Sequence, residues 1–189
     1  MVKKILYFDL DDVILDTSKY LLSWHSKENI FENVSKRSNR NIHEHLNMTW
    51  DECWNQLPQR FWETVPFTPW GKELIKLGEK YFKEIFLLSS PIPNGLCSAG
   101  KQLFVNKYLP QYKNRLILCH KKYASVGSDG LLIDDSYLQE EQFKERSKSD
   151  SFYLFPAYQN NLHEVAHKMY TVGHSEKLKE IEELFKNVY

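Results

Sequence analysis

The amino-acid sequence predicts an α/β fold, a doubly wound and mostly parallel sheet with a small helical cap inserted after the first strand. Short runs of β-prone apolar residues, such as residues 4–8 and 130–133, are bounded by polar residues, which is typical of buried strands. Segments with helical spacing of apolar residues separate these runs, and this alternation favours a parallel sheet. Residues 18–68 contain no strand pattern, so we expect a helical insertion there.

The first predicted strand, residues 4–8, stops abruptly at a group of carboxylates. A helix is expected from Ser18 onward. Within the insertion, Thr49 followed three residues later by Glu52 predicts a capping box at the start of another helix. Residues 65–69 carry two prolines, which break regular structure. The predicted division is a core of residues 1–17 and 69–189 and a cap of residues 18–68.

From residue 70 onward, helices and strands alternate. Leu74, Ile75, Leu77 and Tyr81 recur on one side of a helix. Ser98 is expected to cap the next helix. The predicted helices span residues 70–81, 98–108, 137–146 and 175–187. The predicted strands span residues 85–88, 115–119, 130–133 and 151–155.

The overall composition narrows the class of protein. A chain of 189 residues with 42% hydrophobic residues suits one domain with a real core. Lysine plus arginine (25) balance aspartate plus glutamate (25), which argues against long nucleic acid as a partner and leaves a small anion open. The composition does not indicate an oligomeric state, and a homodimer stays an open alternative.

Cysteine use and apolar runs bear on the compartment. The three cysteines are widely spaced, which indicates a reducing compartment and neither a disulfide framework nor a cysteine-based zinc site. Asp9 interrupts the N-terminal apolar run, so we expect no signal peptide, and no run approaches membrane-spanning length. The expected location is therefore cytoplasmic, with no membrane partner.

Polar side chains follow each of the first four predicted strands. Because the carboxyl ends of parallel strands share one edge of a sheet, these groups are expected to converge. They are Asp9 and Asp11, Ser89 and Ser90, Lys121 and Lys122, and Asp134 and Asp135. Hydroxyl, ammonium and carboxylate groups at one point suit a phosphoryl group with a hard divalent cation such as Mg²⁺. One carboxylate could then attack phosphorus while a second moves a proton.

The first acidic stretch also has a simpler interpretation. It could be a strand end followed by a capping turn, with Asp16 or Thr17 as the helix cap. The complementary groups that follow the later strands favour the phosphoryl site.

The order Asp-x-Asp, Ser, Lys and Asp-Asp at successive strand ends resembles the four motifs of the haloacid dehalogenase superfamily of phosphohydrolases. This resemblance spans most of the chain and implies a Rossmann-like core. In finer detail the chain resembles the 5'(3')-deoxyribonucleotidase branch. The tracts that carry the finer resemblance are Phe61-Trp62 with Pro66 and Pro69, residues 88–91, Lys101 before Tyr108-Leu109, residues 131–135 and residues 155–161.

The resemblance implies a role for each matching acidic residue. Asp9 is the nucleophile that forms an aspartyl-phosphate. Asp11 is the general acid and base, and its backbone carbonyl faces Mg²⁺. Asp134 binds Mg²⁺ together with Asp9, and Asp135 supports the metal site. Asp12 stands where glycine is common in the superfamily.

The same resemblance implies which residues hold the phosphate. Ser89, with Ser90 beside it, binds the phosphoryl oxygens. Lys122 is the expected phosphate lysine, with Lys121 as the alternate. Lys101 is an additional phosphate or charge-balancing contact.

The predicted cap is rich in aromatic residues, among them Trp50, Trp54, Phe61 and Trp62. Their flat faces can stack on a nucleobase or form the core of the cap itself. By resemblance, Phe61 and Trp62 are the pocket candidates. The implied function is a magnesium-dependent phosphomonoesterase that hydrolyses nucleoside monophosphates, deoxy forms preferred. The alternative substrate is another small phosphate ester, such as a sugar phosphate, a phosphorylated cofactor or a nucleic-acid end.

Two further motifs suggest other functions. The segment 95–102 nearly matches a phosphate-binding P-loop, but Gln102 replaces the hydroxyl residue that meets Mg²⁺. His163, Glu164 and His167 match the H-E-x-x-H zinc motif, which keeps a zinc metallopeptidase as an alternative, although a third ligand is not evident.

A phospho-acceptor receiver domain is an alternative of another class, because it also clusters carboxylates, a hydroxyl and a lysine on a doubly wound sheet. Its acidic pair opens the chain, whereas Asp134-Asp135 comes last here, and a large insertion after the first strand is foreign to it. His43 and His45 form another histidine pair, to which we assign no metal.

Overall fold

A five-stranded, all-parallel sheet forms the centre of the computed structural model, which describes residues 2–25, 42–146, 148–158 and 160–188. The strand order is β3-β2-β1-β4-β5. The predicted strands are confirmed to within one residue at either end. They are β1 (Ile5–Phe8), β2 (Glu84–Ser89), β3 (Leu116–Leu118), β4 (Gly130–Asp134) and β5 (Phe152–Leu154).

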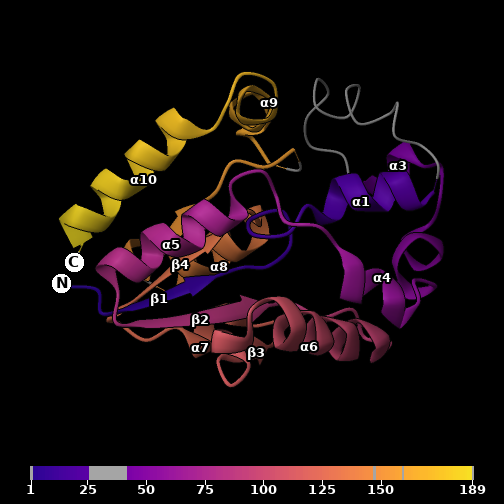
Figure 1. Ribbon diagram of the computed structural model, residues 1–189, viewed down its shortest axis with the longest axis horizontal. Coiled ribbons are helices and arrows are strands. Elements are labelled where there is room, and N and C mark those ends of the chain that lie inside the picture. The colour runs from indigo at the N-terminus through magenta and orange to yellow at the C-terminus, as the bar shows by residue number, and fades with distance from the viewer. Residues whose placement is uncertain (1, 26–41, 147, 159, 189) are drawn as a thin grey trace.

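Side chains alternate between the two faces of the sheet, and helices cover both faces (Figure 1). Leu6 and Phe8 of β1 belong to the larger core, and Tyr7 between them belongs to the smaller one. The larger core receives side chains from α5 (Gly71–Tyr81), α6 (Leu96–Tyr108), α9 (His163–Thr171) and α10 (Ser175–Val188). The smaller core is closed by α7 (Lys122–Ser125) and α8 (Tyr137–Glu145). The fold is therefore α/β and Rossmann-like.

The strand order reverses direction between β1 and β4, which creates a topological switch point. Phe8 pairs with Ile133, and the amide of Asp9 donates to the carbonyl of Ile133 at 2.9 Å. The last residue of β4 and the first residue after β1 therefore lie side by side. In open α/β sheets, ligands bind in the crevice outside the carboxyl ends of the strands at such a point.

The segment inserted after β1 lies beyond the carboxyl ends of the strands (Figure 1). Residues 26–41 of the predicted cap lie outside the described residues. The capping box is confirmed, because the Thr49 amide donates to Glu52 Oε2 at 2.8 Å and the Glu52 amide donates to Thr49 Oγ1 at 3.2 Å. The described helices here are α1 (Thr17–Trp24), α3 (Ile42–His45), the π-helix η2 (Asp51–Asn55) and α4 (Gln59–Thr64).

Helix α6 begins two residues before the predicted start. Gly95 is the N-cap residue, and the side chain of Asn94 caps the helix, because its Oδ1 accepts the amides of Leu96 at 3.1 Å and Cys97 at 3.3 Å. The prediction that Ser98 caps this helix is wrong, because Ser98 lies within the first turn. Two short 3₁₀ helices, η3 (Pro110–Tyr112) and η4 (Ser149–Ser151), complete the structure.

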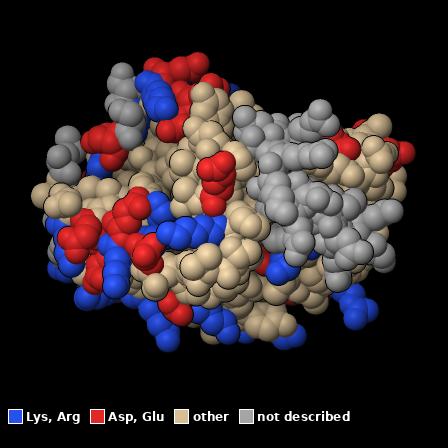
Figure 2. Space-filling view, turned by 90° about the horizontal axis from the view of Figure 1, so that it is seen from above, with Lys and Arg blue, Asp and Glu red and all other residues tan. Residues whose placement is uncertain are grey.

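The two ends of the chain lie away from the carboxyl edge of the sheet. The Lys3 amide donates to the Val188 carbonyl at 2.6 Å, so the two ends of the chain meet at the opposite edge (Figure 1). Lysine, arginine and acidic side chains are interspersed on the face shown in Figure 2. None of the helices in the described ranges is long and apolar enough to cross a membrane.

Candidate active site

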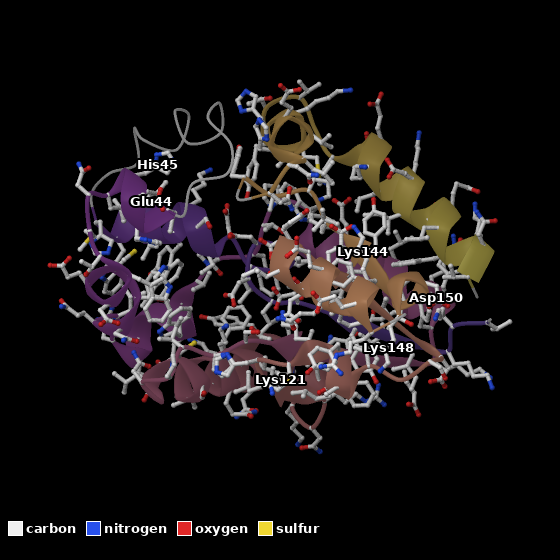
Figure 3. The ribbon with its side chains drawn as sticks, turned by 180° about the vertical axis from the view of Figure 1, so that it is seen from behind. Glu44, His45, Lys121, Lys144, Lys148 and Asp150 are labelled. Atoms are coloured by element: carbon white, nitrogen blue, oxygen red, sulfur yellow. The ribbon has the colours of Figure 1, made fainter. Side chains whose placement is uncertain are left out.

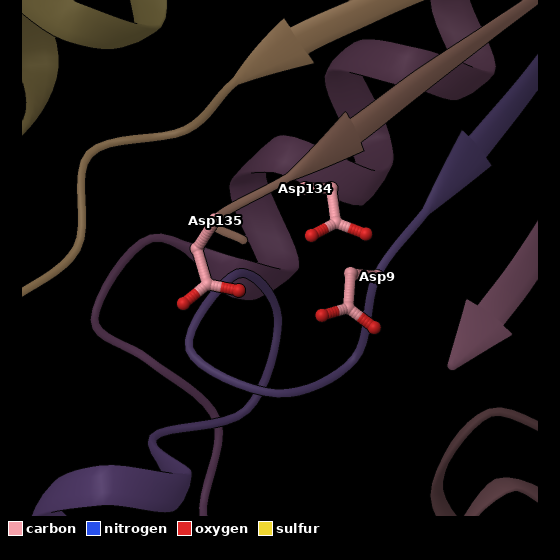
Figure 4. Close-up of side chains that lie close together, drawn as sticks. All are labelled: Asp9, Asp134 and Asp135. Carbon is pink, nitrogen blue, oxygen red and sulfur yellow. The ribbon is translucent and has the colours of Figure 1, made fainter. Parts of the chain in front are cut away.

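Three carboxylates meet at the switch point (Figure 4). Asp9 follows β1, Asp134 ends β4, and Asp135 comes next; one oxygen of each lies within 4.8 Å of the others. Asp9 is 5% exposed and Asp134 is 0% exposed. Burial raises the pKa of Asp9 to about 7, opposed by Lys122 and reinforced by Asp134 and Asp11. Like charges this close are unfavourable unless a cation or bound protons offset them.

Lys122 opens helix α7 and bridges two of these carboxylates. Its Nζ lies 2.7 Å from Asp9 Oδ1 and 2.6 Å from Asp134 Oδ2. Burial disfavours the ammonium, but the two carboxylates outweigh burial and raise the pKa of Lys122. Lys121, the alternate, has an exposed side chain on the surface of the core (Figure 3). The structure therefore brings Lys122, and not Lys121, to the carboxylates.

The three carboxylates have the chemistry of a site for a hard divalent cation. Asp9 Oδ1 is buried, and Lys122 Nζ lies 2.7 Å from it. Among the residues that the structure describes, the ammonium of Lys122 pairs with Asp9 and Asp134, and the three carboxylates still offer oxygen lone pairs. Asp9, Asp134 and Asp135 therefore fit the oxygen donors that Mg²⁺ prefers.

Asp11 lies in a different environment, although it is only two residues from Asp9. Its Oδ1 accepts the Thr17 hydroxyl at 2.8 Å, and its Oδ2 accepts the Ser89 hydroxyl at 3.2 Å. Lys101 Nζ also donates to Asp11 Oδ2 and lies 2.7 Å from Ser89 Oγ. Burial would raise the pKa of Asp11, but the charge and hydrogen bond of Lys101 outweigh it and lower that pKa.

Ser89 and Lys101 supply the donors that a phosphoryl group needs. Ser89 ends β2 and is 0% exposed, and Lys101 reaches it from one turn into α6. Ser90 follows and donates to the Cys119 carbonyl at 3.2 Å. Lys101, the lysine of the segment that resembles a P-loop, therefore contacts Asp11 and Ser89.

Asp12 occupies the position where glycine is common in the superfamily that the sequence motifs resemble. Its φ is 55°, in the left-handed region that glycine adopts freely and aspartate tolerates. The Ser18 amide donates to Asp12 Oδ1 at 2.8 Å. Asp12 therefore accepts an amide in the first turn of α1. Asp16 is the N-cap residue of this helix and one of the two residues that the simpler interpretation predicted as the cap.

A cleft of about 440 Å³ lies between these polar residues of the core and the segment inserted after β1. Asp11, Lys101 and Asp135 line it on the side of the core. Trp50, Trp54 and Trp62, together with His43 and Tyr137, supply ring-bearing side chains. The Trp54 and Trp62 rings are stacked at 6.2 Å with planes 22° apart.

The two pocket candidates differ in position. Trp62 lines the cleft, and Lys101 Nζ lies 5.2 Å from the centre of its ring. Phe61 does not line the cleft, which corrects the expectation from sequence. Phe61 is 0% exposed, and the centre of its ring lies 5.0 Å from that of Tyr20 and 5.5 Å from that of Trp24. Successive residues on a helix point in different directions, so Phe61 belongs to the core of the cap.

Sequence reasoning missed several residues of the cleft. Trp50 and Trp54 were named among the aromatic residues that could stack on a nucleobase but were not chosen as pocket candidates, and His43 and Tyr137 were not considered for the pocket. Tyr137 could have been found, because it comes two residues after the Asp134-Asp135 pair at the same strand end. His43 carries no comparable signal in the sequence.

The histidine motifs do not form a comparable cluster. Across the described ranges, the only group of three or more potential ligands within coordinating distance consists of Asp9, Asp134 and Asp135. His163 and His167 lie on α9 without a third ligand from that part of the chain. His43 and His45 also belong to no group of three potential ligands among the described residues. The structure therefore gives the zinc alternative no ligand cluster in those ranges.

Comparison with known proteins adds no assignment. No family model matches the sequence, and no significant match was found among curated proteins.

Proposed function

We propose that this protein is a magnesium-dependent phosphomonoesterase of the haloacid dehalogenase type that hydrolyses nucleoside monophosphates. One observation carries the proposal: Asp9 and Asp11 are two residues apart, but their carboxylates belong to two different clusters of side chains. Asp9 joins a group of carboxylates bridged by Lys122. Asp11 joins Ser89 and Lys101, which can donate to a phosphoryl group. Two carboxylates with divergent pKa values are typical of divided roles in catalysis.

The first cluster supports the choice of Mg²⁺. Asp9, Asp134 and Asp135 offer carboxylate oxygens within 4.8 Å of one another. When bound there, Mg²⁺ would act as a Lewis acid and neutralise charge on the transferring phosphoryl group. Lys122 adds a fixed positive charge beside the same carboxylates.

The proposed reaction has two steps. Asp9 attacks phosphorus and forms an aspartyl-phosphate while Asp11 donates a proton to the leaving oxygen. Asp11 then takes a proton from the water that hydrolyses this acyl phosphate. Ser89 and Lys101 donate hydrogen bonds to the phosphoryl oxygens, where negative charge develops.

Lys101 suggests how Asp11 gains the proton that it must donate. In the free protein Lys101 pairs with Asp11 and lowers the pKa of Asp11, which keeps the carboxylate ionised. A bound phosphoryl group would compete for Lys101, and loss of this pairing would raise the pKa of Asp11. Substrate binding would then favour protonation of Asp11 at the step that needs it.

The cleft supports a nucleoside as the leaving group. A volume of about 440 Å³ lies within the range of small-molecule sites. Trp50 and Trp54 offer ring faces in the cleft beside Asp11 and Lys101, and the buried Trp62 stacks on Trp54. Stacking on such faces tolerates any base. The resemblance to deoxyribonucleotidases favours deoxy forms.

The test is phosphate release from a panel of nucleoside monophosphates, with and without Mg²⁺. The wild type should release phosphate only with the metal, and Asp9→Asn should release none. Asp150→Asn is the matched control, because Asp150 is 65% exposed and pairs with Lys3 at the opposite edge of the sheet (Figure 3). Equal release by Asp9→Asn and the wild type contradicts the mechanism. Turnover of a sugar phosphate without any nucleotide contradicts the substrate class.

A further inference from the structure

Asp12 combines an unusual backbone with a fully used carboxylate. A glycine would adopt its φ of 55° without strain, so the aspartate contributes through its side chain. The Ser18 amide donates to Oδ1 at 2.8 Å, and the Ser18 hydroxyl donates to Oδ2. Asp12 is 9% exposed, so water competes little for these bonds.

Ser18 is the second residue of α1, the first helix of the inserted segment. Its neighbour Thr17 donates its hydroxyl to Asp11 Oδ1 at 2.8 Å. Two successive carboxylates of the loop thus accept hydrogen bonds from two successive residues of the first turn of α1. Because Thr17 and Ser18 are adjacent, a shift of Ser18 would also move the hydroxyl of Thr17.

We propose that Asp12 is a positioning residue that acts on Asp11 through the first turn of α1. By holding Ser18, it places the Thr17 hydroxyl on Oδ1 of Asp11. The other oxygen, Oδ2, stays directed at Lys101 and Ser89, where the phosphoryl group would bind. The inference rests on the proposed function, in which Asp11 moves the proton.

Two other accounts of Asp12 make different predictions. In the first, its negative charge tunes the nearby carboxylate cluster, so neutral asparagine and glycine would have equal effects. In the second, Asp12 only completes the turn, so glycine would be neutral for turnover. If Asp12 is a positioning residue, asparagine should largely replace it, because its carbonyl oxygen can still accept the Ser18 amide.

The experiment compares Asp12→Gly, Asp12→Asn and Ser18→Ala, and the double variant Asp12→Gly with Ser18→Ala. We expect kcat of Asp12→Gly to fall about tenfold with KM nearly unchanged, since small displacements of catalytic groups cost this much or more. Asp12→Asn should keep most of kcat. Ser18→Ala removes the hydroxyl bond but keeps the amide bond, so it should lose less of kcat than Asp12→Gly does, and the double variant should be no slower than Asp12→Gly. Amide hydrogen exchange at Ser18 should be faster in Asp12→Gly than in the wild type or Asp12→Asn.

Each other outcome overturns the inference. Equal losses in Asp12→Asn and Asp12→Gly favour the charge, and an unchanged kcat in Asp12→Gly favours a turn without a catalytic effect. A change confined to KM indicates substrate contact. If Asp12→Gly does not fold, Asp12→Ala takes its place, because it also removes both acceptor oxygens; a full kcat in that variant together with unchanged amide exchange at Ser18 contradicts the link. An inactive wild type contradicts the proposed function instead, and Ser18 exchange then decides the link to α1 alone.

Discussion

Asp9 and Asp11 have the same side chain but opposite electrostatic environments. Burial beside Asp134 and Asp11 raises the pKa of Asp9 to about 7, although Lys122 opposes this rise. Burial also disfavours ionised Asp11, but Lys101 outweighs burial and lowers its pKa. The neighbours therefore divide the two carboxylates into a member of the acidic cluster and a partner of Lys101. Residue type alone carries no sign of this division.

Asp16 provides a prediction for stability against pH. Burial raises the pKa of Asp16 to about 6, although the Tyr170 hydroxyl, which donates to it at 2.8 Å, opposes the shift. The unfolded chain has a pKa near 3.9 for this group, so the folded state binds the proton more tightly. The contribution of Asp16 to stability is therefore present below about pH 4 and is lost as pH rises through 6.

Asp16→Asn should remove this loss, because an amide cannot ionise and its oxygen can still accept from Tyr170. The free energy of unfolding of the variant minus that of the wild type should increase by on the order of 2 kcal/mol between pH 4 and pH 7. Denaturant unfolding at several pH values measures this gain. Exposed Glu141→Gln is the control. A difference from wild type that does not change with pH contradicts the account.

The sequence was sufficient to find the residues at the strand ends, because a parallel sheet brings its carboxyl ends to one edge. It could not choose the partners of these residues. Lys101 of α6 pairs with Asp11, and Lys122 pairs with Asp9 and Asp134, and these contacts join residues that are far apart in the chain. Phe61 and Trp62 illustrate the same limit, since aromatic content does not indicate which ring faces the cleft.

The contact between α4 and α6 joins the inserted segment to the core. Gly100 lies where the two helices meet, and a Cβ there would lie 2.5 Å from Trp62 Cβ and 2.7 Å from the Gln59 carbonyl oxygen. Lys101, the next residue, contacts Asp11. A close approach of the helices thus places the wall of the cleft near the loop that carries Asp11.

Gly100→Ala should separate these helices. The added methyl group must displace backbone atoms of α4, so the free energy of unfolding should fall by about 1–3 kcal/mol. KM should rise, because Trp62 lines the cleft. Urea unfolding and steady-state kinetics measure the two effects. Gly127→Ala is the control, since its nearest atom is the Asp129 carboxylate at 3.1 Å, which can rotate away. No change in either quantity contradicts a tight contact.

At the scale of elements, the strands were the most predictable part. Their apolar runs are short, rich in β-prone residues and bounded by polar residues, which is typical of buried strands. Helix ends were less predictable. Both Asn94 and Ser98 are residue types that cap helices, and it is the side chain of Asn94 that accepts the first amides of α6. The π-helical turn over Asp51–Asn55 has no sequence pattern that separates it from an α-helix.

At the scale of the whole molecule, the order β3-β2-β1-β4-β5 places the switch point between β1 and β4, where Asp9 and Asp134 meet. The inserted segment lies over the same edge and supplies one wall of the cleft (Figure 1). Alternation of strands and helices predicted the parallel sheet. The relation between insertion and cleft could not be predicted, because it depends on contacts such as that of Gly100 with α4.

Magnesium should stabilise the whole molecule. A ligand that binds only the folded state adds about 2.7 kcal/mol at a hundred times its Kd. Because the pKa of Asp9 is about 7 without metal, protons compete with Mg²⁺, and the stabilisation should grow from pH 6 to pH 8. Thermal unfolding with and without Mg²⁺ measures it. Asp134→Asn should lose the effect and Asp150→Asn should keep it; equal stabilisation of both variants contradicts the site.

The central claim, transfer of the phosphoryl group to Asp9, is tested most directly by trapping the intermediate. The protein is incubated with Mg²⁺ and a nucleoside monophosphate that it turns over, quenched in acid, and digested for peptide mass spectrometry. The account predicts one phosphoryl group on the peptide that contains Asp9 and none in Asp9→Asn. Steady turnover with no phosphoryl group on that peptide, or with the group on another residue, would contradict it.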